Sequence, residues 1–154
     1  MIPIEQFHPL VVHFPIVFFL SLAALDTFAL FRNTPIGDRG GVANLSAGLA
    51  VLAGLAAVAA YSFGDAALDV AEASGIIEGR LGTHELLGTT TAIALAVWGL
   101  ARAFIWWRQL PVSKGRAWGM VFMELAFSIL IITTAYYGGQ LVYEFGVNVA
   151  SSAG

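Results

Sequence analysis

The three histidines of the chain are the residues best suited to bind a cofactor, because all of them lie near the same ends of its apolar segments. His8 precedes the first segment, His13 lies one turn inside it, and His84 precedes the third. Imidazoles on facing helices hold haem iron in helix bundles, and an imidazole inside an apolar span needs a polar partner or a metal. We therefore expect His13 and His84 to be the axial ligands of a b-type haem.

The residues around these histidines favour a flat ligand. Gly88 follows His84 by one helical turn and removes a side chain from the face on which a porphyrin would lie. His8 and His13 are five residues apart, about 140° around an ideal helix, so both reach one centre only if the neighbouring prolines alter the backbone. We expect His8 to be a supporting or alternate ligand.

Other interpretations of the histidines stay open. Arg80 lies four residues before His84, where it is placed to pair with a haem propionate or a lipid phosphate, or to be a surface arginine among acids. The three histidines, with acids such as Glu5 and Glu85, could instead form a zinc or copper site. A third interpretation is that they cap helix ends and bind no cofactor.

Two carboxylates, Asp26 and Glu124, lie inside apolar segments. Intramembrane acids are candidates for proton transfer or for hydrogen bonds between helices. Because no basic partner within the segments is evident, we expect both acids to form structural interhelical hydrogen bonds. Proton or metal transport is the least favoured function, since four short spans without inverted repeats are atypical of transporters.

Four apolar segments must position these side chains. They cover residues 10–31, 42–63, 86–107 and 117–143. Each reaches the roughly 20 residues that cross a hydrocarbon core, and none shows the alternation of barrel strands. We predict an all-α, integral membrane four-helix bundle that forms a single domain over residues 1–154. The long connection 64–83 contains the helix-forming stretch Ala66–Ala73, which predicts a short interfacial helix between the second and third spans.

Small residues recur along the second segment and near the end of the fourth. A stripe with spacings of four and three is formed by Ala43, Ala47, Ala50, Gly54 and Ala57. Such stripes let helix backbones approach closely in lipid, so we expect this face to be a contact surface. The pair Gly138 and Gly139 predicts either a bend or the close approach of another group.

The composition excludes several classes of protein. Hydrophobic residues make up 58% of the 154 residues and charged residues 11%, which excludes disorder and a water-soluble enzyme core. The absence of cysteine excludes disulfides, thiolate zinc sites and c-type haem attachment. Seven scattered basic residues are too few for nucleic-acid binding. No catalytic motif supports a stand-alone enzyme.

Basic residues are distributed unevenly between the connections. Six of the seven lie on the side of the first and third connections, counting Arg102 one and a half turns inside the third segment, whereas the second connection has Arg80 alone among acids. By the positive-inside rule both termini face outward, which in a bacterium places them on the periplasmic side of the inner membrane. The expected partners are the lipid bilayer and either other membrane subunits or a periplasmic electron carrier.

The string HPLVVHFPI at residues 8–16, with Asp26 in the same span, resembles the opening motif of the "domain of unknown function 2231" family of small four-helix bacterial membrane proteins. His84 and the closing GGQLVY at residues 138–143 agree with it. In that family a histidine often precedes the glycine after LVY, whereas this chain has Phe145 there. A site that used such a histidine would be altered or reduced here.

The resemblance implies a redox-linked membrane protein, because related domains occur beside electron-transfer modules. Together with the positions of the histidines, it favours a subunit that binds a b-type haem or is quinone-linked, with its site on the periplasmic side. The alternative function is a cofactor-free accessory subunit of a larger photosynthetic or respiratory membrane complex.

Overall fold

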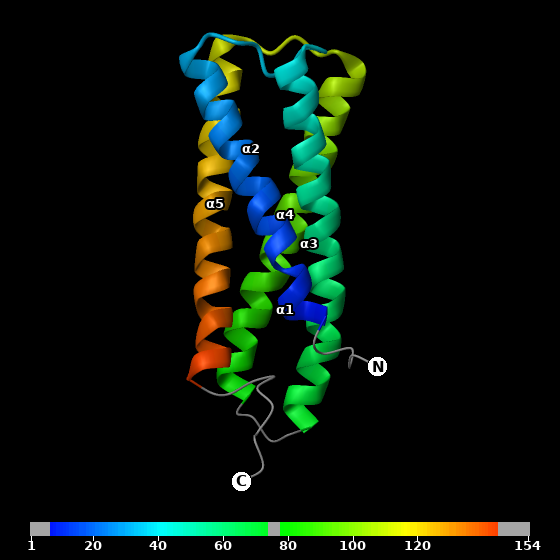
Figure 1. Ribbon diagram of the computed structural model, residues 1–154, viewed down its shortest axis with the longest axis vertical. Coiled ribbons are helices and arrows are strands. Elements are labelled where there is room, and N and C mark those ends of the chain that lie inside the picture. The colour runs from blue at the N-terminus through cyan, green and yellow to red at the C-terminus, as the bar shows by residue number, and fades with distance from the viewer. Residues whose placement is uncertain (1–6, 74–77, 145–154) are drawn as a thin grey trace.

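The computed structural model describes residues 7–73 and 78–144, and it places the side chains of all of these except 68–73 and 78–80. The helices are α1 (Phe7–Val11), α2 (His13–Phe31), α3 (Gly41–Ala73), α4 (Glu78–Arg108) and α5 (Lys114–Tyr143). No strand occurs in the described residues. Figure 1 shows an elongated bundle of long helices, with the connections α2–α3 and α4–α5 together at its upper end. We call this the loop end. The predicted all-α fold is confirmed.

Four helical stretches are long and apolar enough to cross a membrane. They are Phe7–Phe31, Gly41–Ala67, Leu81–Arg108 and Lys114–Tyr143. Each of the four predicted spans lies within one of these stretches. Many large apolar side chains on them are exposed, as expected for surfaces that face lipid tails.

The first stretch is interrupted at Val12, which separates α1 from α2. Pro15 explains the position of this break, because it has no N–H to donate to the carbonyl of Val11 one turn earlier. Pro15 is the third residue of α2, where the first turn tolerates proline. The break lets α1 take its own direction against α3, beside which it lies in Figure 1.

Residues 66–73 are helical, as predicted, but they continue α3 without a break instead of forming a separate short helix. With 33 residues, α3 is about 50 Å long at 1.5 Å per residue, which exceeds the thickness of a hydrocarbon core.

The predicted stripe of small residues is the face of α3 that packs on α4. All five of its members are buried: Ala43, Ala47, Ala50, Gly54 and Ala57. A Cβ on Gly54 would lie 3.0 Å from the backbone oxygen of Leu95. From the other side, a Cβ on Gly99 would lie 2.8 Å from the oxygen of Ala50. The two backbones are therefore in direct contact, and the prediction of a contact surface is confirmed.

This contact makes Gly99 intolerant of a methyl group. We expect Gly99→Ala to lower the free energy of unfolding in detergent by about 1–3 kcal/mol, because a backbone oxygen cannot move aside like a flexible side chain. Gly48→Ala is the matched control: a Cβ there meets no atom within 4 Å, and the substitution gains up to about 1 kcal/mol of helix propensity. Equal melting temperatures for the two variants would contradict the close contact.

Candidate functional site

Two polar sites lie at opposite ends of the bundle, and the first is a pair of histidines. His8 comes from α1 and His84 from the second turn of α4. Their ring centroids are 6.3 Å apart and their ring planes are inclined at 79°. Both side chains are half-buried. The break at Val12 and the start of α4 thus bring together two imidazoles that are 76 positions apart in the sequence.

His8 is held by the backbone of α3. Its Nδ1 atom donates a hydrogen bond of 2.9 Å to the carbonyl oxygen of Ala60. Gly64, one turn further along α3, provides the space for the ring, since a Cβ there would lie 2.9 Å from Cε1 of His8. Because Nδ1 carries the proton, Nε2 retains a free lone pair. A backbone carbonyl on one ring nitrogen is the usual arrangement around a histidine that binds metal through the other.

His84 lies against α5. A Cβ on Gly138 would be only 2.8 Å from Cε1 of His84, so glycine at this position makes room for the imidazole. Of the two predictions for the glycine pair, the close approach of another group is confirmed. The Nδ1 atom of His84 is buried without a hydrogen-bond partner, although the backbone of Thr134 is close enough to influence the ring. Because Nδ1 is enclosed by the protein, a ligand to this imidazole has to approach Nε2.

His13 was expected to face His84, but the structure places its side chain in an exposed position. The reason is the break at Val12, which turns His8 toward the bundle while His13 starts the next helix on the outer surface. The histidine in ring contact with His84 is therefore His8. Gly88 is half-buried, and a Cβ there would meet nothing within 4 Å, so open space remains one turn from His84.

The other residues predicted beside the histidines are either exposed or outside the described side chains. Arg80 belongs to α4, but its side chain lies outside the described residues, as do Glu5 and Phe145. Glu85 is exposed. Within the ranges that the structure describes, no group of three or more histidines and acids is placed to hold a metal ion.

The second site is a cluster of three charged side chains near the loop end. Arg102 of α4 donates from Nη1 to Oδ2 of Asp26 in α2 at 2.5 Å and to Oε1 of Glu124 in α5 at 2.8 Å. All three side chains are at most 2% exposed. We call this group the Arg102 cluster. The expectation that the two acids lack a basic partner within the spans is wrong, because Arg102 pairs with both.

Neutral groups complete the Arg102 cluster. Ser46 of α3 donates its hydroxyl to Oδ1 of Asp26. Trp98, one turn before Arg102, donates Nε1–H to Oε1 of Glu124 at 3.2 Å. Nη2 of Arg102 also donates to the carbonyl oxygen of Ile36 in the α2–α3 connection, at 3.4 Å. The cluster therefore joins all four spans to a loop, and the interhelical role expected for the two acids is confirmed.

Sequence reasoning missed Arg102, Ser46 and Trp98, although one signal was available. Asp26 lies near the end of its span, Arg102 near the end of α4, and Glu124 near the start of the antiparallel α5. All three therefore had to lie at one depth near the loop end, where opposite charges inside an apolar medium pair with one another.

A family model described as "Predicted membrane protein (DUF2231)" matches residues 4–151 of the chain. No curated protein and no solved structure matches it.

Proposed function

Because the chain belongs to the DUF2231 family of predicted membrane proteins, we propose from its histidine pair that it is a membrane-embedded electron-transfer subunit that binds a b-type haem through His8 and His84. The single observation that carries this proposal is the approach of two half-buried imidazoles from different helices. His84 has no hydrogen bond at Nδ1, and His8 keeps Nε2 free.

The separation of the two rings supports a shared metal. If a metal lay between the rings, two imidazole–metal bonds of about 2 Å each and the two ring radii would separate the centroids by up to about 6 Å. The observed distance is 6.3 Å. The open space at Gly88 supports a flat ligand beside His84, as the sequence suggested.

Bound haem would supply one-electron redox chemistry between its ferrous and ferric forms. The chain's own residues would hold the two imidazoles in position and would set the basicity of the His8 ring. Ala60 accepts the Nδ1 proton of His8, which orients that ring and raises its basicity. Gly64 and Gly138 leave room for the rings against α3 and α5. A quinone-linked form of this function would use His84 as the hydrogen-bond donor to a quinone carbonyl, because the one proton of the neutral His8 ring is already donated to Ala60.

The charge distribution supports a periplasmic location for the histidine pair. Five basic residues lie in or next to the connections at the loop end: Arg32, Arg39, Arg108, Lys114 and Arg116. The positive-inside rule assigns that end to the cytoplasm of a bacterial inner membrane, and therefore the opposite end to the periplasm. An electron carrier in the periplasm, or a neighbouring membrane subunit, is the partner that such a site would serve.

The test is a reduced-minus-oxidised visible spectrum of the protein purified in mild detergent, with a pyridine haemochrome assay for stoichiometry. We expect the bands of a low-spin b-type haem at about one haem per chain, as two histidine ligands from one chain require. A flat spectrum after expression with ample haem would overturn the proposal and favour the cofactor-free accessory subunit, whose partners would then be sought by gentle co-purification.

The contact between Gly138 and His84 gives a subtler prediction. In Gly138→Ala the new methyl group meets Cε1 of His84 and must displace the imidazole, so we expect the haem content to fall several-fold or the spectrum to change. Gly139→Ala is the control, since a Cβ there meets no atom within 4 Å. Identical haem spectra for the two variants would show that the position of His84 does not matter to the cofactor.

A further inference from the structure

The Arg102 cluster contains one more acid than base. Asp26 and Glu124 together oppose a single guanidinium, and all three lie in the interior of the bundle. If every group were ionised, the cluster would carry one uncompensated negative charge in an apolar medium. Burial of an unpaired charge is among the most costly arrangements in a protein, and a cation or a proton removes that cost.

The hydrogen bonds identify the atom at which the charge is uncompensated. Asp26 is satisfied at both oxygens, by Ser46 at Oδ1 and by Arg102 at Oδ2. Oε1 of Glu124 accepts from Arg102 and from Trp98. Oε2 of Glu124 is buried and has no hydrogen-bond partner. Of the four carboxylate oxygens, it alone is without a donor.

The groups that face Glu124 from the neighbouring helices supply no second cation. The residues that act on it are Asp26 from α2 and Arg102 and Trp98 from α4. Ser128, on α5 itself, directs its hydroxyl to the backbone oxygen of Glu124. Within the part of the chain that the structure places, Arg102 is the one cation that pairs with these carboxylates.

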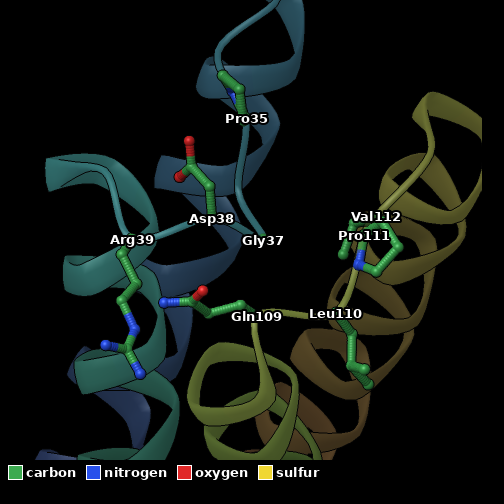
Figure 2. Close-up of a pocket in the computed structure, with 8 residues that line it drawn as sticks. All are labelled: Pro35, Gly37, Asp38, Arg39, Gln109, Leu110, Pro111 and Val112. Atoms are coloured by element: carbon green, nitrogen blue, oxygen red, sulfur yellow. The ribbon is translucent and has the colours of Figure 1, made fainter.

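A pocket at the loop end lies beside the connection that contacts the Arg102 cluster. Figure 2 shows it between the α2–α3 and α4–α5 connections, and its volume is about 320 Å³. Its lining includes Pro35 and Gly37, which flank Ile36 in the sequence. Ile36 is buried, and its carbonyl oxygen accepts from Nη2 of Arg102. The pocket is therefore lined by the two sequence neighbours of the residue whose carbonyl oxygen contacts the guanidinium.

We propose that the Arg102 cluster binds one exchangeable proton, carried on Oε2 of Glu124 and exchanged with water through the pocket at the loop end. The proton neutralises the cluster as a whole and converts the bare oxygen into a hydroxyl. This site is independent of the histidine pair, which lies at the other end of the bundle, so it stands whether or not the chain binds haem.

The test is infrared spectroscopy of the intact protein in H2O and D2O. We expect one carbonyl band of a protonated carboxyl that shifts in D2O. Labelling with ¹³C-glutamate in cell-free synthesis should lower its frequency, and ¹³C-aspartate should not. Glu124→Gln removes the group and should abolish the band while the protein stays folded, because glutamine is an uncharged isostere of the protonated acid.

The variant Asp26→Asn tests whether Glu124 is protonated because of the charge balance of the Arg102 cluster or because of burial alone. With Asp26 neutral, one guanidinium faces one carboxylate, so Glu124 should ionise and the band should disappear although Glu124 is still present. A band that persists in Asp26→Asn would overturn the proposal, as would a band that follows the aspartate label. The absence of any such band, with a melting temperature that rises in sodium chloride but not in choline chloride, would assign the site to a metal cation instead.

Discussion

Arg102→Met should destabilise the protein more than any other single substitution of a charged residue described above. The variant leaves Asp26 and Glu124 buried beside each other without their common donor. Removing one partner of a buried ion pair costs about 3–5 kcal/mol, because the remaining charge has to be neutralised or hydrated inside the protein. The measurement is the free energy of unfolding in mixed detergent micelles, together with the melting temperature.

Arg108→Met is the matched control for the loss of an arginine from the same helix. Arg108 is exposed at the end of α4, and its guanidinium lies 5.8 Å from the ring centroid of Trp107. An exposed interaction of this kind is worth at most about 1 kcal/mol. If Arg108→Met destabilised the protein as much as Arg102→Met, the Arg102 cluster would contribute no more to stability than an exposed arginine does.

A triple variant separates the missing charge from the missing side chain. Arg102→Met combined with Asp26→Asn and Glu124→Gln restores neutrality without restoring the guanidinium. Because buried ion pairs are often replaceable by neutral groups of similar volume, we expect the triple variant to be more stable than Arg102→Met alone. If the added substitutions instead lowered the stability further, packing around the arginine would dominate over charge.

The parts of the fold that the sequence predicted depend on properties of single segments. A span is recognised from its apolar length, and the four predicted spans lie within the helical stretches of the structure. The α3 face that packs on α4 was predicted because the spacing of Ala50 and Gly54 places small residues on one side of a helix. Neither inference needs the position of a second helix.

The composition of the two sites depends on how helices are rotated against one another, which segment properties do not determine. Arg102 lies inside the predicted span 86–107, yet its pairing with Asp26 follows from the way α2 and α4 face each other. His8 and His13 were both candidates, and the break at Val12 decides which of them faces His84. The HPLVVHFPI motif therefore predicted that histidines form the site, whereas the break at Val12 determines which of its two histidines faces His84.

The second large expected effect is on the amount of haem that the protein binds. His8→Ala and His84→Ala should each lower the bound haem per chain by more than about tenfold, since even the loss of a residue that only orients a metal ligand costs 10–100-fold in affinity. The measurement is the Soret absorbance relative to protein, checked by the pyridine haemochrome assay. His13→Ala is the control, because its exposed side chain makes no ring contact with His84 in the structure.

The same three variants distinguish the pairing in the structure from the pairing that the sequence favoured. If His13→Ala lost haem while His8→Ala kept it, His13 and His84 would be the ligands, and α1 would have to change its direction when haem binds. Added imidazole gives a further criterion, because in His84→Gly it can occupy the vacated space beside Gly138. Recovery of the low-spin spectrum with imidazole in His84→Gly, and no effect of imidazole on His13→Gly, would identify ligation by His84 itself, whereas a lost fold would not be restored by a small ligand.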